Sequence, residues 1–334
     1  MNVGIVGAGR QGWRRARSLD SEDGDRLLGV ADVNHEAARQ LGREFGVQAM
    51  DRWERVVEDP EIEVVFICTP PNLHALIGVA ALQQGKHVLC EKPLGHTVQD
   101  GEALVVAARL ASRKLKCGFN HRHFPAIRQA KEWCDEEAIG ELTHVRCRYG
   151  IGGQVGYDKD WRACREISGG GELMDQGVHG LDLCRWFLGE FSEAFAFLST
   201  AFWDIAPLED NAFVLLRTPK GQVASLHASW TQWKNLFSFE VFGKDGFIHV
   251  EGLGGSYGTQ GAALCRREFF KPFEEQTIEY RGEYPSWREE WQEFKAAIRE
   301  EREPLGNGAD GLAALRLADA LYRSAARGEL IAVG

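Results

Sequence analysis

The stretch NVGIVGAGRQG, residues 2–12, joins a short apolar run to three glycines in the spacing GxGxxG. A strand that leads through such glycines into a helix is typical of a dinucleotide-binding turn. The glycines permit a tight turn, close approach of the backbone to a pyrophosphate, and close packing of helix on strand. The N–H groups and the dipole at the helix N-terminus favour the anion. The candidate cofactor contacts in this turn are Gly7, Gly9, Arg10, Gln11 and Gly12.

An acidic residue follows at the spacing that a ribose contact requires. Asp32 ends the apolar run RLLGVAD (26–32), about 20 residues after the last glycine. A carboxylate there accepts hydrogen bonds from the ribose hydroxyls and repels a 2′-phosphate, so NAD is favoured as the cofactor. NADP stays open, because Arg10 could reach a phosphate. The alternative is a glycine-rich turn with no ligand.

The pattern of apolar segments predicts two domains, because 334 residues exceed the size at which one core usually keeps growing. Before residue 121, short continuous apolar runs alternate with amphipathic helical segments, which indicates a doubly wound parallel Rossmann sheet over residues 1–121. From about residue 143, longer strands are joined by turns such as TPKGQ and GKDG. They indicate an open, mostly antiparallel sheet covered by helices over 122–334. Helical patterns at 286–302 and 309–327 cover that sheet or pack back on the first domain.

Composition narrows the class of ligand. The net charge is −10, which argues against nucleic acid and anionic membranes as partners, since both need clustered Lys and Arg. The eight cysteines form no CxxC pair, so a reducing compartment is expected. With no basic leader and no apolar run of membrane-spanning length, the expected location is the cytoplasm. A small neutral molecule is the expected ligand.

Two further loops belong with the glycine turn. CTPPNLH (68–74) and EKP (91–93) each follow an apolar run, and ligands of open α/β sheets lie beyond the carboxyl ends of the strands. His74 either lines the cofactor or caps a helix. These loops complete the candidate cofactor contacts with Thr69, Pro70, Asn72, His74, Glu91 and Lys92.

The order of these motifs resembles the Gfo/Idh/MocA family of nicotinamide-dependent oxidoreductases. GFNHRHFPAI (118–127), WR (161–162) and GGGELMDQGVHGLD (169–182) extend the resemblance to about residue 190. It implies that Lys92 lies near the nicotinamide and the substrate, that Asp175 and His179 form the acid/base pair, and that two or four copies of the chain associate through the second sheet. The candidate substrate contacts are Lys92, Asn120, Arg122, Trp161, Arg162, Asp175 and His179.

The residue types suit alcohol oxidation, in which a hydride leaves carbon and the hydroxyl proton goes to a base. His179 is the candidate base, because histidine titrates near neutral pH. If 175–188 is helical, Asp175 shares its face and orients the ring. Lys92 would stabilise the developing oxyanion or remove the proton itself. The alternatives are a solvated lysine and a surface Asp–His pair. The preceding glycines favour function, because they permit close approach of a ligand.

These observations predict an NAD(H)-dependent dehydrogenase or reductase of a cyclic polyol, sugar or inositol. Two other functions stay open. One is glycoside cleavage through transient oxidation of a sugar carbon, and the other is a non-catalytic dinucleotide sensor. His121 and His123 lack further ligands at a recognised metal spacing, so no metal is expected.

Overall fold

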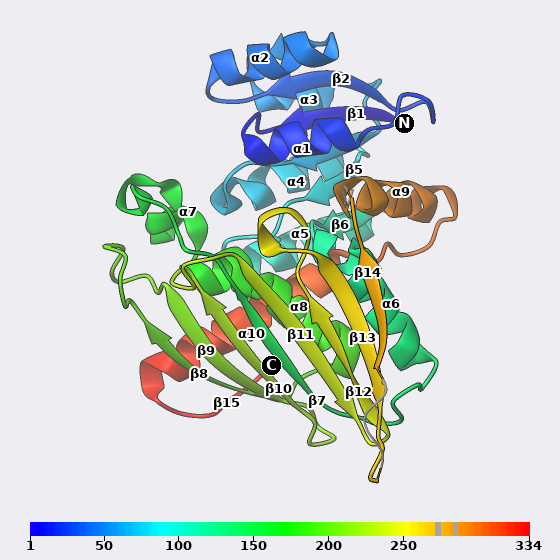
Figure 1. Cartoon of the computed structure of the whole chain (residues 1–334). Helices are drawn as coiled ribbons and strands as arrows, with labels where there is room; N and C mark the ends of the chain where they lie inside the picture. Colours follow the sequence, from blue (N-terminus) through cyan, green and yellow to red (C-terminus); the bar gives the residue numbers. More distant parts are fainter. Residues whose placement is uncertain (271–274, 283–285) are drawn as a thin grey trace. The chain divides into compact units, whose positions relative to one another are not determined.

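The computed structural model describes residues 1–270, 275–282 and 286–334, and the chain divides into two compact units. The first unit comprises Met1–Asn120 and Pro285–Leu315, and the second comprises His121–Tyr284 and Arg316–Gly334. The first boundary lies next to the expected one at residue 121. The segment 285–315, expected within the second domain, belongs with the first unit. Figure 1 shows the course of the chain.

The first unit is built on a six-stranded sheet in the order β3-β2-β1-β4-β5-β6, whose strands pair in parallel, as the sequence predicts. Its central strands β1, β4 and β5 are short apolar runs that are mostly buried, and the residues of β4 are all buried. The order reverses between β1 and β4, which is where such sheets bind ligands. The strands are β1 Asn2–Val6, β2 Arg26–Ala31, β3 Gln48–Met50, β4 Val64–Ile67, β5 His87–Cys90 and β6 Leu115–Cys117. The helices between them are α1 Arg10–Ser18, α2 His35–Phe45, α3 Trp53–Glu58, α4 His74–Gln83 and α5 Val98–Ala111, with a 3₁₀ turn η1 at Pro71–Leu73.

A helix from the far end of the sequence completes this unit. In α9, Ser286–Arg299, Trp291 and Phe294 are fully buried in the core around the parallel sheet. The Trp291 ring packs edge-on against Phe66 of β4, with ring centroids 4.9 Å apart. Of the two placements that the sequence left open for this helix, the structure has the one against the first unit.

The second unit is built on a nine-stranded sheet in the order β14-β13-β12-β11-β7-β10-β9-β8-β15. The pairings are antiparallel apart from β10 with β7, so the prediction of a mostly antiparallel sheet is confirmed. The strands are β7 Leu142–Gly150, β8 Glu193–Ser199, β9 Asn211–Arg217, β10 Val223–Ser229, β11 Leu236–Gly243, β12 Gly246–Glu251, β13 Gln260–Arg266, β14 Glu275–Tyr280 and β15 Ile331–Ala332.

Helices cover one face of the second sheet. α6 packs on β12 and β13, and α8 packs on β7 and β10. The helices are α6 Pro125–Asp135, α7 Arg165–Ser168, α8 Val178–Leu188 and α10 Gly308–Arg327, of which the last begins in the first unit; the short turns are η2 Asn120–His123, η3 Tyr157–Lys159, η4 Trp161–Ala163, η5 Leu173–Gly177 and η6 Gly255–Tyr257. In the described parts of the chain, no helix combines the length and apolarity that crossing a bilayer requires.

Candidate active site

The three glycines of the first turn serve different purposes. Gly7 has a φ of 102°, and a Cβ there would lie 2.6 Å from the carbonyl of Cys68. A Cβ on Gly12 would lie 2.0 Å from the Gly7 carbonyl oxygen. Both positions therefore need glycine for protein packing. At Gly9, by contrast, no described residue other than its two chain neighbours comes within 4 Å of the Cβ position. The open surface of the turn is at Gly9, where α1 begins.

The polar groups around the turn fit a dinucleotide. Asp32 Oδ2 accepts a hydrogen bond from the Ala8 N–H at 2.6 Å, and Oδ1 accepts one from Asn34 at 2.7 Å. These bonds hold the carboxylate beside the glycine turn. The hydroxyl of Thr69 is buried and has no hydrogen-bond partner among the described residues, an arrangement that a bound ligand would complete. Arg10 is exposed. These hydrogen-bond donors and acceptors suit a pyrophosphate and a ribose.

The loop after β4 is tied to the loop after β5 by a buried imidazole. His74 is fully buried, with Nδ1 2.9 Å from the carbonyl oxygen of Pro93 and Nε2 2.9 Å from that of Thr69. Both ring nitrogens therefore face the protein backbone. The Lys92–Pro93 peptide bond is cis. Lys92 and Pro70 are half-buried and Asn72 is exposed.

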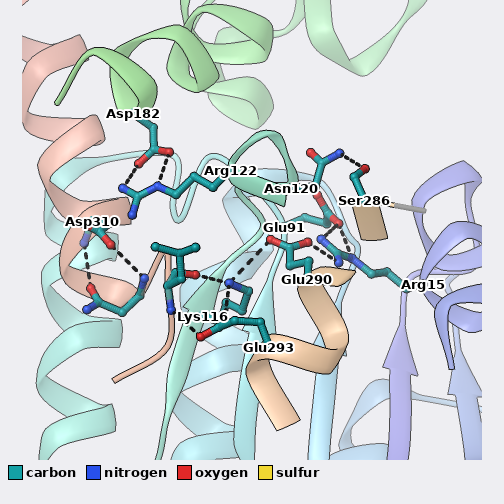
Figure 2. A network of polar contacts seen from close by, with 12 residues as sticks. Arg15, Glu91, Lys116, Asn120, Arg122, Asp182, Ser286, Glu290, Glu293 and Asp310 are labelled. Atoms are coloured by element: carbon teal, nitrogen blue, oxygen red, sulfur yellow. Dashed lines mark hydrogen bonds and ion pairs between the residues drawn. The ribbon is translucent and has the colours of Figure 1, made fainter. Parts of the chain in front are cut away.

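Glu91 takes part in a buried ionic cluster inside the first unit (Figure 2). Its Oε1 accepts a hydrogen bond of 2.7 Å from Nε of Arg15, whose side chain is fully buried. A second nitrogen of Arg15 donates to Glu290 of α9 at 2.6 Å. Burial raises the pKa of Glu290, while Arg15 and Lys116 oppose that rise. The carboxylate of Glu91, the residue that precedes Lys92, is thus bound by Arg15 inside the protein.

Asp175 and His179 lie on one continuous helical segment of the second unit. The expected helix 175–188 is present as α8, but it is preceded by a π-helical turn, η5, which carries Asp175. His179 is buried, and its ring stacks on that of His121 with centroids 3.8 Å apart. Arg162 Nε lies 3.4 Å from Asp175 Oδ2, and its guanidinium covers the ring of Trp161. Arg162 thus links two other expected site residues, Asp175 and Trp161, whereas His179 stacks on His121, which the sequence did not mark as a site residue.

The glycines before Asp175 are explained by packing against protein. A Cβ on Gly170 would lie 2.0 Å from the hydroxyl of Tyr322, and one on Gly171 would lie 2.1 Å from the carbonyl oxygen of Glu209. The Glu209 carboxylate, which is buried, accepts hydrogen bonds from the N–H groups of Gly171 and Leu173 and from the Tyr322 hydroxyl. The sequence predicts that these glycines permit close approach of a ligand. In the structure they permit close approach of Glu209 and Tyr322 instead.

Two expected substrate contacts have their polar groups bonded within the protein. Arg122 is buried and makes a bidentate ion pair with Asp182, at 2.8 and 2.6 Å. The Asn120 amide donates to the Ser286 hydroxyl at 2.9 Å within the first unit. Sequence reasoning missed Glu209 and Tyr322, which cap the Asp175 segment, and no spacing pattern marks either one. Among the described residues, no group of three or more His, Cys, Asp or Glu side chains could hold a metal ion.

Comparison with known proteins assigns both halves of the chain. The oxidoreductase family with an NAD-binding Rossmann fold matches residues 1–119, and the GFO/IDH/MocA C-terminal domain matches residues 127–249. A levoglucosan dehydrogenase of Pseudarthrobacter phenanthrenivorans is 30% identical over 74% of this chain and 73% of its own length. The chain belongs to the Gfo/Idh/MocA family.

Other relatives match nearly end to end. An inositol 2-dehydrogenase of Rhizobium meliloti is 29% identical over 100% of this chain and 99% of its own. The solved structure of a levoglucosan dehydrogenase in complex with NADH and levoglucosan superposes with a TM-score of 0.91, at 26% identity, over 100% of this chain and 99% of that one. This Gfo/Idh/MocA chain is therefore an oxidoreductase with an NAD-binding Rossmann domain.

Proposed function

We propose that this Gfo/Idh/MocA chain is an NAD(H)-dependent dehydrogenase or reductase that acts on a secondary alcohol or ketone of a cyclic polyol, sugar or inositol. The observation that carries the proposal is the similarity along the whole chain to a levoglucosan dehydrogenase that binds NADH and levoglucosan. The inositol 2-dehydrogenase relative supports the same substrate class. Bound NAD supplies the hydride acceptor for alcohol oxidation, or the donor in the reverse direction when reduced.

The first unit provides the groups that would hold the cofactor. The N–H groups at the start of α1, beside the open surface at Gly9, would bind the pyrophosphate. Asp32 would accept hydrogen bonds from the ribose hydroxyls, since its carboxylate is already held at the end of β2. The unpartnered hydroxyl of Thr69 would complete the site. The negative charge of Asp32 favours NAD over NADP.

The second unit provides the proton-transfer pair. His179 would take the hydroxyl proton during oxidation and return it during reduction, because an imidazole exchanges protons near neutral pH. Asp175 would orient that ring and stabilise its charged form. The ion pair with Arg162 holds the Asp175 carboxylate in place.

Lys92 would place its positive charge beside the substrate oxygen and stabilise negative charge that develops there. The competing role, in which Lys92 itself removes the proton, predicts a different pH profile. If Lys92 is the base, the fall of kcat/KM at low pH persists when His179 is replaced by Asn. If His179 is the base, this fall of kcat/KM at low pH disappears when the imidazole is removed.

The substrate is tested by following nicotinamide absorbance with a panel of levoglucosan, myo-inositol, 1,5-anhydro-D-fructose and common aldoses. We expect turnover with at least one member of the panel and a preference for NAD(H). Tight NADH binding without turnover of any alcohol or ketone would overturn the proposal. Cleavage of an aryl glycoside without net NADH formation would favour transient sugar oxidation instead.

A further inference from the structure

Lys92 stands between two residues that are each held inside the first unit. On its N-terminal side, the Glu91 carboxylate is bound by the buried guanidinium of Arg15 at 2.7 Å. On its C-terminal side, the Pro93 carbonyl oxygen lies 2.9 Å from Nδ1 of His74. The main chain at Lys92 is thus anchored from both directions.

The His74 ring joins this loop to the cofactor turn. Its other nitrogen, Nε2, lies 2.9 Å from the Thr69 carbonyl oxygen, and the ring is fully buried. The backbone at Cys68 and Thr69 in turn packs within about 3 Å of the Cβ position of Gly7. One imidazole therefore connects the Lys92 loop to the loop that packs on the glycine turn.

We propose that His74 is a positioning residue, which fixes the Lys92 ammonium relative to the nicotinamide end of the cofactor site by holding the loops after β4 and β5 together. The inference rests on the proposed role of Lys92. It replaces the direct cofactor contact that the sequence suggested for His74, since both of its ring nitrogens face backbone carbonyls.

Elementary hydrogen-bond chemistry supports this assignment. Burial lowers the pKa of His74, although the hydrogen bonds to Thr69 and Pro93 oppose that shift. A neutral ring has one N–H and donates to one of the two carbonyls. The tautomer with the proton on Nδ1 donates to the Pro93 carbonyl and so ties the Lys92 loop to the start of α4, which follows the loop after β4. An apolar side chain of the same size would fill the space but would supply no donor to either oxygen. The loops would then keep their packing and lose the polar connection that fixes their separation.

The chain offers a matched control at the opposite end of the same strand. His87 begins β5, whereas Lys92 follows its end. His87 Nδ1 accepts a hydrogen bond from the Lys114 N–H at 2.9 Å, and burial lowers the pKa of this ring as well. Replacing either histidine by Phe therefore removes an imidazole that bonds to the backbone of the first unit. Only the His74 change acts on the Lys92 loop.

The kinetic test compares His74→Phe, His74→Gln and His87→Phe in the full-length enzyme with the best substrate of the panel. We expect His74→Phe to lower kcat roughly 10- to 100-fold, because a displacement of about 1 Å at a reacting group has effects of this size. KM and the Kd for NADH should change less than about twofold, since the cofactor-binding groups remain. His74→Gln, which restores one donor, should recover part of kcat, and His87→Phe should leave kcat unchanged.

A second readout does not depend on turnover. Acylation of lysines, followed by mass spectrometry of the peptide that contains Lys92, reports the surroundings of its amine in the NADH complex. We expect His74→Phe to change the labelling rate of Lys92 and His87→Phe to leave it as in the wild type. If wild-type enzyme turns over no substrate, the proposed function fails, and labelling alone judges the role of His74. Equal labelling of Lys92 in all variants, or equal loss of kcat in both Phe variants, would overturn the inference.

Discussion

Asp32 is the residue that we propose favours NAD over NADP. Replacing it with Asn should lower kcat/KM for NAD by roughly 10- to 100-fold, the worth of a hydrogen bond to a charged group. The ratio of NADP to NAD activity should rise, because the charge that repels a 2′-phosphate is gone. Steady-state kinetics with both cofactors measures the effect. Asp51→Asn, at an exposed position after β3, is the control. An unchanged NAD preference in the Asp32 variant would contradict this role.

His179 carries the proposed proton transfer. His179→Asn should reduce kcat by roughly 10²- to 10⁴-fold, the usual contribution of a general base. NADH binding, followed by the fluorescence of the reduced cofactor, should stay close to that of the wild type. Asp175→Asn should have a smaller effect, because the imidazole remains. Wild-type kcat in His179→Asn would remove this residue from the mechanism.

The sequence predicts candidate site residues from their types and spacing, but it does not predict the direction in which every side chain points. The spacing of Gly7, Gly12 and Asp32 predicts their surroundings because it reflects one local strand–turn–helix unit. The motifs predict ligand contacts for Glu91 and Arg122, yet their charges are paired with Arg15 and Asp182. Those partners lie 60 or more residues away along the chain. A contact of that range leaves no pattern in a single sequence.

At the scale of the elements, the position of the π turn η5 depends on the close packing of the glycines that precede it. Gly170→Ala would put a methyl group 2.0 Å from the Tyr322 hydroxyl. Because the surroundings are packed, this change should destabilise the protein by about 1–3 kcal/mol and lower kcat by displacing the segment that carries Asp175. Urea unfolding and initial rates measure the two effects. Gly261→Ala in β13 is the control, since its Cβ would meet its nearest neighbour at an ordinary 3.7 Å. Equal stability of the two variants would contradict the packing explanation.

His87, at the start of β5, should make the free energy of unfolding depend on pH. Burial, with help from Arg113 and Lys114, lowers the pKa of His87 from 6.5 to about 4. The unfolded chain therefore binds a proton that the folded chain excludes, and the free energy of unfolding should fall as pH decreases from 6.5 to about 4. His74 should act in the same direction. Urea titrations across this range measure the slope, which should be smaller in His87→Phe. A slope that is the same in that variant would exclude His87 as a source.

Helices and strands can be predicted where the periodicity of apolar residues is a local feature of the sequence. They are harder to predict where contacts with distant residues determine the conformation or the packing partner. The alternating runs of residues 2–120 gave the parallel sheet. The apolar positions after residue 175 gave a helix, but they do not distinguish a π turn from an α turn, because both place similar residues inward. The amphipathic segment of α9 fitted two partners. The contact of Trp291 with Phe66 places α9 in the first unit. The sequence of α9 alone does not predict this contact.

At the scale of the whole molecule, the outer face of the second sheet supports the prediction of a homo-oligomer. Phe197 of β8 lies opposite Phe213 of β9, and these side chains are 67% and 49% exposed, with Leu215 at 52%. An apolar patch of this kind favours association of two copies. The wild type should be a dimer or tetramer by light scattering, and the double variant Phe213→Lys, Leu215→Lys should be a monomer. Leu110→Lys, at an exposed site on α5, should leave the mass unchanged. A monomeric wild type would refute the prediction.

The placement of α9 also bears on how the protein is made. Its residues are synthesised after strands β7 to β14 of the second unit, yet they supply Trp291 to the core of the first unit and Glu290 to the buried Arg15. A nascent chain that ends before this helix leaves that arginine short of a partner and Phe66 without its covering ring. The first unit therefore reaches its finished state only after the second unit has been synthesised, and chains truncated before α9 should be recovered as insoluble protein or bound to chaperones.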